Sequence, residues 1–249
     1  MNLSYSGLSD KGLVRSDNQD TIHLPENGCQ LPCLFLVADG MGGANGGKTA
    51  SKLAVRIIPE TFSQEVEKKG PEQALRLAVH KANKTIYDQA RENPLLHGMG
   101  TTVVGLAILD DGRALIVNVG DSRCYLLRDG ELHQLSEDHS VMQEMVRNGK
   151  MTEEQAREHG MRNMLSKAVG TSPNITADLF AVTMLNVNDL FLLCSDGLHG
   201  PVPDSKIHGI MMQHKDISSK TQQLVQPVSY THLRAHETVL DLVCRLLLE

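Results

Sequence analysis

Short hydrophobic runs and longer helical repeats occur along the chain. The runs Cys33–Ala38 and Phe191–Ser195 each have the length and composition of a buried strand. The segments Thr49–Lys68 and Pro71–Arg91 instead repeat apolar residues every three or four positions, and Pro71 stands where a helix can start. The pattern therefore predicts buried strands together with two long amphipathic helices.

The remaining pattern is rich in short strands. Asp-Gly pairs at 111–112 and 129–130 are hairpin signals, because both residues tolerate the positive φ angles of tight turns. Strands are predicted at Leu3–Leu8, Thr101–Leu109, Ala114–Val119, Arg123–Arg128, Glu131–Leu135, Thr176–Val182 and Leu190–Cys194. The polar regions Ser140–Glu158 and Asp204–Gln213 are predicted to be helical. Helices set among antiparallel hairpins predict an α+β fold, an antiparallel β-sandwich flanked by helices on both sides.

Composition narrows the class of protein. The 249 residues are 41% hydrophobic and contain no long Pro/Ser linker, so we expect one domain. A net charge of -6, with 3% aromatic residues and no tryptophan, argues against a nucleic-acid partner. No signal peptide and no apolar run of about 20 residues is found, so we expect a cytoplasmic protein without a membrane partner.

The five cysteines show no zinc-ligand spacing. They are Cys29, Cys33, Cys124, Cys194 and Cys244. Cys124 and Cys194 fall inside predicted strands, where we expect reduced thiols in the core of a cytoplasmic protein.

Two of the buried runs end in the same dipeptide. The first leads to Asp39-Gly40 and the second to Asp196-Gly197. A carboxylate at the end of a strand is held rigidly, and the following glycine leaves the backbone open to a ligand. Two such ends brought together would form an oxygen site suited to Mg²⁺ or Mn²⁺. The alternative is that each Asp-Gly pair is a simple turn.

A second pattern overlaps the first Asp-Gly pair. Residues Gly42–Thr49 match G-x-x-x-x-G-K-[ST], the phosphate-binding loop of many nucleotidases, between a predicted strand and a predicted helix. In that interpretation Lys48 would reach the terminal phosphates. Asp39 weakens it, because it places an anion directly before the phosphate cradle.

Several further motifs follow in a fixed order. They are Arg15–Asp20, Asp39–Gly43, Gly100–Thr102, Val119–Arg123, Asp138–Ser140 and Ser195–Gly197. In these motifs the chain resembles the metal-dependent PPM/PP2C family of protein serine/threonine phosphatases in its bacterial form, from about residue 5 to about residue 225. The family normally has an acidic residue where Lys48 stands, which makes the nucleotidase pattern an accident of one substitution.

The resemblance implies a set of metal ligands. Asp39 would bridge two Mn²⁺ or Mg²⁺ ions, with the carbonyl of Gly40 and with Asp20 serving the second ion. Asp196 would bind the first ion, and Asp121 would help to hold a third, weaker one. The ions would activate a water for attack on phosphorus, so no protein nucleophile is needed. Asp121 could instead be only a hairpin residue.

The resemblance also assigns roles around these ligands. Arg15 would bind the phosphoryl oxygens, a task that suits its planar guanidinium, although it could instead be a surface residue that pairs with Asp17 or Asp20. We favour Asp138-His139 as a helix N-cap and its neighbour over a catalytic pair. Met41 follows the Asp-Gly pair where animal relatives often carry a histidine, and no general acid is assigned. The segment 143–162 corresponds to the family's flap beside the active site, where it would gate the substrate.

The expected activity is hydrolysis of phosphoserine and phosphothreonine in proteins. The implied partners are phosphorylated proteins, including a serine/threonine kinase and its substrates, and we expect a monomer. A P-loop nucleotidase is the weaker alternative.

The end of the chain departs from the family. The family carries a further metal-binding Asp-Asn and then a last core strand, but nothing after Val225 fits: Asp241 is followed by Leu242. Our hypothesis is a phosphatase domain over 1–225 that is truncated at its C-terminal end, with foreign sequence over 226–249. The alternative is a native helix over Thr238–Leu248. A lost carboxylate would also allow a catalytically impaired scaffold that binds phosphoproteins.

Overall fold

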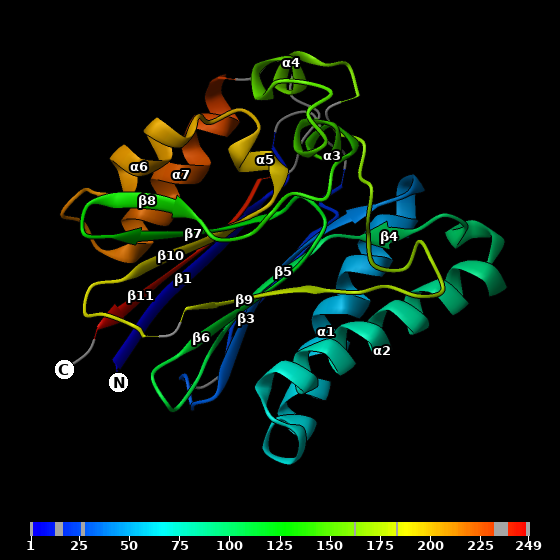
Figure 1. Ribbon diagram of the computed structural model, residues 1–249, viewed down its shortest axis with the longest axis horizontal. Helices are drawn as coiled ribbons and strands as arrows, with labels where there is room; N and C mark the ends of the chain where they lie inside the picture. Colours follow the sequence, from blue (N-terminus) through cyan, green and yellow to red (C-terminus); the bar gives the residue numbers. More distant parts are fainter. Residues whose placement is uncertain are drawn as a thin grey trace.

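The computed structural model describes residues 2–12, 17–25, 28–161, 163–182, 184–231 and 239–247. Two antiparallel sheets lie face to face, with helices on both outer faces of the pair (Figure 1). This confirms the predicted α+β sandwich.

The first sheet has the strand order β1-β11-β10-β7-β8. Its strands are β1 (Asn2–Asp10), β7 (Arg123–Arg128), β8 (Glu131–Gln134), β10 (Leu190–Cys194) and β11 (Val239–Leu247). β11 pairs antiparallel with β1 on one side and with β10 on the other. The two ends of the chain therefore run side by side (Figure 1).

The second sheet has the strand order β2-β3-β5-β6-β9, and β4 pairs with the end of β3. Its strands are β2 (Asp20–His23), β3 (Cys33–Met41), β4 (Gly100–Thr101), β5 (Val103–Ile108), β6 (Ala114–Val119) and β9 (Asp178–Val182). The pairing of β2 with β3 sets Asp20 directly opposite Asp39.

Helices cover the outer face of each sheet (Figure 1). The second sheet is covered by α1 (Gly43–Lys69) and α2 (Pro71–Glu92), and a short 3₁₀ turn, η1 (Pro94–Leu96), follows them. The first sheet is covered by α5 (Asp196–His199), α6 (Asp204–Met211) and α7 (Ile217–Thr231). Two short helices, α3 (Val141–Arg147) and α4 (Glu153–Glu158), lie together at one end of the molecule.

Alternation along the strands divides the core into three layers. In β3, Leu34 and Leu36 pack toward α1 and α2, whereas Phe35 and Val37 point between the sheets. β10 behaves in the same way, with Phe191 facing the other sheet. Successive side chains of a strand point to opposite faces, so a strand that is buried on both faces reads as one continuous apolar run.

Three expectations about local structure need correction. α1 starts at Gly43, six residues earlier than predicted, so the glycine-rich segment is helical. The polar region 140–158 forms two short helices instead of one, because the chain turns at Gly149, where φ is 67°. The alternative of a helix over Thr238–Leu248 is wrong, since Val239–Leu247 is a strand.

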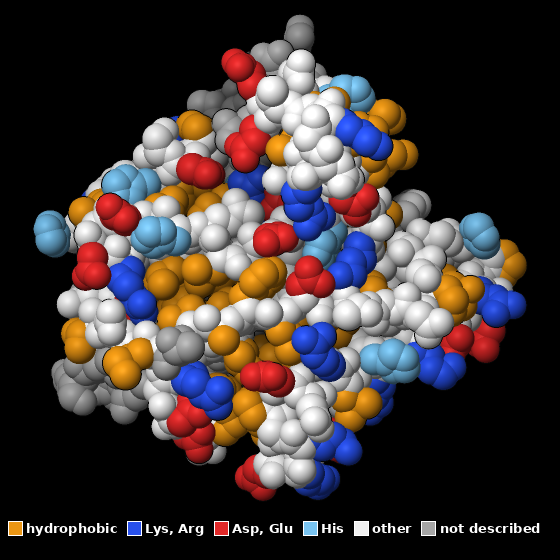
Figure 2. Space-filling view, viewed as in Figure 1, with side chains coloured by type: hydrophobic (Ala, Val, Ile, Leu, Met, Phe, Trp, Pro, Cys, Tyr) orange, Lys and Arg blue, Asp and Glu red, His pale blue; other side chains and the backbone are white. Residues whose placement is uncertain are grey.

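The distribution of charged side chains on the surface is relevant to the kind of partner the protein could bind. Figure 2 shows acidic and basic side chains interspersed over the face drawn there. Among the described residues, no helix is long and apolar enough to cross a membrane.

Candidate active site

Four aspartates from four separate elements meet at one end of the sandwich. Asp20 begins β2, Asp39 lies near the end of β3, Asp121 follows β6, and Asp196 begins α5 directly after β10. Asp20, Asp121 and Asp196 all lie close enough to Asp39 to shift the pKa of its carboxyl. The structure thus brings together the four aspartates that the sequence singled out.

The crowding of these carboxylates changes their proton affinity. Burial raises the pKa of Asp39 well above its usual value, and the charges of Asp20 and Asp121 raise it further. Burial likewise raises the pKa of Asp121, helped by the charges of Asp196 and Asp138. Each carboxylate disfavours the ionised form of its neighbours, and a nearby cation would relieve this repulsion.

The backbone of Asp39 is held by the Gly100–Thr102 motif. The hydroxyl of Thr101 donates to the carbonyl of Asp39 at 2.8 Å. The hydroxyl of Thr102 accepts from the N–H of Asp39 at 3.0 Å and contacts the hydroxyl of Ser122 at 2.7 Å. The motif is therefore a clamp that positions the Asp39 peptide and connects it to the loop that carries Asp121.

Gly40 lies where no side chain fits. A Cβ at this position would be 2.1 Å from the carbonyl oxygen of Gly47 and 2.6 Å from that of Gln19. The N–H of Gly40 also donates to the carbonyl of Gln19 at 3.2 Å. Close backbone packing of β3 against α1 and against the chain before β2 thus requires glycine here.

Two histidines hold the turn that carries Asp121, and the sequence did not reveal either role. Nδ1 of His139 accepts from the N–H of Gly120 at 3.0 Å, and the N–H of His139 donates to the carbonyl of Gly120 at 3.0 Å. Nε2 of His199 lies 3.0 Å from the carbonyl oxygen of Asp121, to which it can only donate. Asp121 is 9% exposed, so the interpretation of this residue as a mere surface turn is disfavoured.

The imidazole of His139 is itself held by a hydrogen bond from its other ring nitrogen. Because Nδ1 of His139 accepts a hydrogen bond, Nε2 carries the proton and donates to Asp178 at 3.0 Å. Asp178 also accepts from Lys167 at 2.8 Å. Burial would raise the pKa of Asp178, but the hydrogen bonds from Lys167 and His139 hold it below its usual value.

The second histidine stays uncharged. Burial, together with the nearby guanidinium of Arg123, lowers the pKa of His199 to about 3. His199 is the last residue of α5, the helix that Asp196 begins. It therefore joins the helix that carries Asp196 to the turn that carries Asp121.

The prediction that Asp138 and His139 are a helix N-cap and its neighbour was wrong. Ser140 is the N-cap of α3, and its hydroxyl accepts from the N–H of Gln143 at 3.1 Å. Asp138 instead accepts a forked pair of hydrogen bonds from Arg123, with contacts of 2.7–3.1 Å. The guanidinium also donates to the hydroxyl of Tyr125 at 2.9 Å.

The nucleotidase interpretation is not supported by the geometry. Residues 43–49 of its pattern form the first turns of α1 instead of an open loop. Nζ of Lys48 contacts Asp17 at 2.6 Å, and this hydrogen bond lowers the pKa of Asp17. Lys48 thus ties α1 to the segment that leads into β2.

Of the remaining residues named in the sequence analysis, one lies outside the described part of the chain and two have observed contacts. Arg15 lies outside the described residues, so its placement stays a prediction. Asp17 pairs with Lys48, and Asp20 accepts from the hydroxyl of Ser195 at 3.0 Å.

The predicted flap leaves and rejoins the sandwich next to His139. Ser140 and Leu165 form an isolated β-bridge, and the N–H of Ser166 donates to the carbonyl of His139 at 2.9 Å. Between these points lie α3 and α4, with Met161 and Met164 exposed. The predicted flap is therefore anchored to the same histidine that holds the Asp121 turn.

The chemistry of the four aspartates fits a divalent cation. They supply hard carboxylate oxygens, the donors that Mg²⁺ and Mn²⁺ prefer, and their mutual repulsion favours binding of a positive ion. In the described part of the chain, no three acidic, His or Cys side chains yet surround a common point as a ready-made metal site. The four aspartates thus lie near one another without forming a closed set of ligands around one point.

Residues 13–241 match the protein phosphatase 2C family. The chain belongs to this family. The serine/threonine phosphatase stp of Listeria welshimeri is 36% identical over 220 residues, covering 87% of this chain and 86% of the relative. The crystal structure of the serine/threonine phosphatase Stp1 from Staphylococcus aureus superposes with a TM-score of 0.88 at 32% identity, covering 99% of this chain and 96% of the other.

A further solved member of the phosphatase 2C family bears on the aspartates. The catalytic domain of the serine/threonine protein phosphatase PstP, solved in complex with two manganese ions, matches 98% of this chain with a TM-score of 0.84 at 30% identity. These relatives are serine/threonine protein phosphatases, which confirms the family and the class of enzyme that the motifs indicated.

Proposed function

We propose that this chain is a metal-dependent phosphoprotein phosphatase that hydrolyses phosphoserine and phosphothreonine with a metal-activated water. The observation that carries the proposal is the close cluster of Asp20, Asp39, Asp121 and Asp196, in which desolvation and like charge raise the pKa of Asp39 and Asp121. Asp20 and Asp121 are buried and Asp39 and Asp196 are half-buried. Crowding of carboxylates without a counter-charge is costly, and a bound cation offsets that cost.

The chain's own residues divide the work. Asp39 would bridge two ions, with Asp20 and the Gly40 carbonyl on one side and Asp196 on the other, and Asp121 would serve a third, weaker ion. Mn²⁺ or Mg²⁺ at this site would supply a water of lowered pKa directed at phosphorus. The two threonines of the Gly100–Thr102 clamp keep the Asp39 peptide in place while substrate binds.

Substrate binding involves two further parts of the chain. Arg15 would bind the phosphoryl oxygens through its guanidinium, and the flap between Ser140 and Leu165 would contact the protein that carries the phosphate. The general acid that protonates the leaving serine or threonine is not assigned to a residue. The proposed partners are phosphorylated proteins in the cytoplasm, including a serine/threonine kinase and its substrates, and the proposed state is a monomer.

The second candidate is a catalytically impaired scaffold that binds phosphoproteins. It is favoured by the sequence after Val225, for which we keep the proposal of a foreign segment over 226–249 joined to a phosphatase domain over 1–225. That segment supplies β11, but it lacks the Asp-Asn pair that the family carries before its last strand. One carboxylate ligand would then be missing from the first ion.

Hydrolysis of a phosphothreonine peptide by the full chain, titrated with Mn²⁺ and then treated with a chelator, separates the two candidates. Mn²⁺-dependent phosphate release that the chelator abolishes supports the phosphatase. Folded protein that binds the peptide but releases no phosphate at millimolar Mn²⁺ supports the scaffold. Asp39→Asn is the matched inactive variant in both cases.

A further inference from the structure

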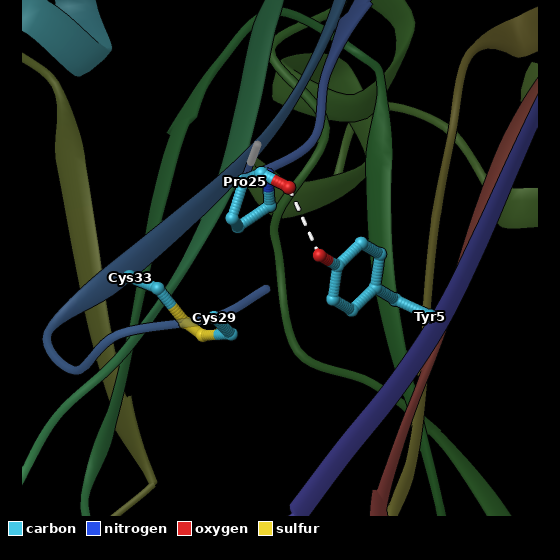
Figure 3. The surroundings of a disulfide bond; sticks show 4 residues. All are labelled: Tyr5, Pro25, Cys29 and Cys33. Atoms are coloured by element: carbon cyan, nitrogen blue, oxygen red, sulfur yellow. Dashed lines mark hydrogen bonds between the residues drawn. A yellow bond between two sulfur atoms is a disulfide. The ribbon is translucent and has the colours of Figure 1, made fainter. Parts of the chain in front are cut away.

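A disulfide joins Cys29 and Cys33 at the opposite end of β3 from Asp39. The two Cα atoms are 5.9 Å apart, within the usual range for a disulfide (Figure 3). Cys33 is the first residue of β3, and Cys29 lies in the loop between β2 and β3. Asp39 lies six positions after Cys33 along the strand, a distance of about 20 Å. The pair is therefore remote from the aspartate cluster.

The crosslink closes a ring that is too small to stabilise the fold strongly. The two cysteines are four positions apart. A crosslink restricts the unfolded chain more when the loop it closes is longer, so a ring of five residues contributes less than a long loop would. The small ring argues against a mainly structural role.

The surrounding loop has a second anchor that does not depend on the disulfide. The hydroxyl of Tyr5 in β1 donates to the carbonyl of Pro25 at 2.9 Å (Figure 3). The ring of Tyr5 also packs edge-on against Phe35 of β3, with ring centroids 5.2 Å apart. Because neither contact involves the sulfur atoms, we expect the protein to stay folded in both the oxidised and the reduced state.

The pair is accessible where the other described cysteines are not. Cys29 is partly exposed, and Cys33 lines a cavity of about 350 Å³ between the β2–β3 loop and α1. Its wall combines polar and apolar side chains, among them His23, Gln30 and Phe62. Cys124 and Cys194, by contrast, are buried in the core and belong to no disulfide, as the sequence predicted. Buried thiols are inert, so thiol chemistry on the folded protein is directed to the 29/33 pair.

We propose that Cys29 and Cys33 form a reversible thiol–disulfide site that reacts with low-molecular-weight thiols and disulfides. A thiolate attacks Sγ of Cys29, the bond to Cys33 breaks, and Cys33 leaves as a thiolate that takes up a proton from water. A second thiolate then displaces Cys29 from the mixed disulfide. The net reaction converts one protein disulfide and two thiols into one protein dithiol and one small disulfide.

The direction of attack follows from exposure. Cys29 is the more accessible partner, whereas Cys33 is only 5% exposed at the start of a buried strand. Cys29 should therefore carry the mixed disulfide and Cys33 should resolve it. In a reducing compartment, disulfides are mostly transient and redox-sensing, which agrees with a reversible pair in a cytoplasmic protein.

The test equilibrates the full chain with buffers of varied reduced-to-oxidised glutathione ratio, followed by acid quenching, alkylation and peptide mass spectrometry. We expect the 29–33 disulfide to be lost and re-formed as the ratio changes, while Cys124 and Cys194 remain unmodified and the far-UV circular dichroism stays constant. A disulfide that survives the most reducing buffer in folded protein would overturn the proposal. So would a pair that stays reduced in the most oxidising buffer.

Two single variants test the order of attack. With oxidised glutathione, Cys33→Ser should accumulate a mixed disulfide at Cys29. In Cys29→Ser, glutathione should modify Cys33 at least about tenfold more slowly. Equal rates in the two variants would overturn the assignment of Cys29 as the attacked residue. Neither readout depends on phosphatase activity, so the outcome is independent of the proposed function.

Discussion

His139 and Gly120 exchange two hydrogen bonds, one in each direction, and both are 3.0 Å long. Gly120 has φ of 109°, and a Cβ there would lie 2.6 Å from the Thr102 side chain. The turn before Asp121 is thus fixed on one side by the imidazole and on the other by the clamp that holds Asp39. The relationship makes His139 a positioning residue for Asp121.

Replacing His139 separates positioning from simple packing. In His139→Ala the buried N–H of Gly120 loses its acceptor, which costs about 1–3 kcal/mol of unfolding free energy and lets Asp121 move. His139→Asn places an amide oxygen near the position of Nδ1 and should retain part of this contact. We expect the Mn²⁺ concentration for half-maximal activity to rise more in the alanine variant than in the asparagine variant. If both variants lose stability and keep the wild-type Mn²⁺ dependence, His139 has a structural role only.

Asp178 provides a prediction about pH. Its pKa is lowered in the folded protein by Lys167 and His139, so it stabilises the fold above its unfolded pKa of about 3.9 and loses this effect as pH falls through the lower folded value. The side chain is 36% exposed, so solvent screening limits the effect to about 0.5–1 kcal/mol. The difference in Tm between wild type and Asp178→Asn should be present at pH 5 to 7 and should shrink below about pH 4. A difference that grows in acid would contradict the assignment.

The wild-type Asp39 carboxylate should support hydrolysis while lowering the stability of the metal-free protein. Asp39→Asn removes a half-buried charge whose pKa is raised by desolvation and by Asp20, so the metal-free variant should have a higher Tm than wild type at pH 7. The same variant should lose Mn²⁺-dependent hydrolysis. Asp111→Asn is the matched control, because Asp111 is exposed and paired with Arg113, and it should not raise Tm. Differential scanning fluorimetry with and without Mn²⁺ measures Tm, and phosphate release measures hydrolysis. A metal-free Asp39→Asn protein less stable than wild type would contradict the repulsion argument.

Lys48 should matter little for catalysis. Its pair with Asp17 is about 40% exposed, and such pairs contribute about 0–1 kcal/mol, so Lys48→Ala should change kcat/KM by about fivefold or less. Lys48→Glu introduces the acidic residue usual in the family, but its charge repels Asp17, so this variant should lose some activity. The double variant Lys48→Glu/Asp17→Lys restores an opposite-charge pair and should recover that activity. Complete loss of phosphate release in Lys48→Ala would revive the nucleotidase interpretation.

The sequence predicted the parts of the site that are local. Asp39 and Asp196 could be singled out because each follows a buried apolar run, and the layered sandwich follows from the same runs. His139 and His199 could not be, because their partners are 19 and 78 positions away and only the fold brings them together. The start of α1 was missed because glycines disfavour a helix locally, whereas packing of α1 against β3 and α2 stabilises it. The Cys29–Cys33 pair was missed because one partner belongs to a loop.

The last prediction concerns the end of the chain. Glu237 and Thr238 directly precede Val239, the first residue of β11, whereas the family carries Asp-Asn before its last strand. The pairing of β11 with β10 sets Asp241 opposite Cys194, two residues before Asp196, so the start of β11 is delivered to the end of the strand that leads into the aspartate cluster. In the sequence, Glu237 is the acidic residue two positions before β11, and its side chain is one methylene longer than the family's aspartate. The double variant Glu237→Asp/Thr238→Asn should lower the Mn²⁺ concentration for half-maximal hydrolysis, and Glu237→Gln should raise it or leave no activity. Calorimetric titration of Mn²⁺ into all three proteins gives the same order without turnover. If Glu237→Gln binds and hydrolyses as wild type does, the last ligand of the family is absent from this chain, and the other aspartates alone sustain whatever activity remains.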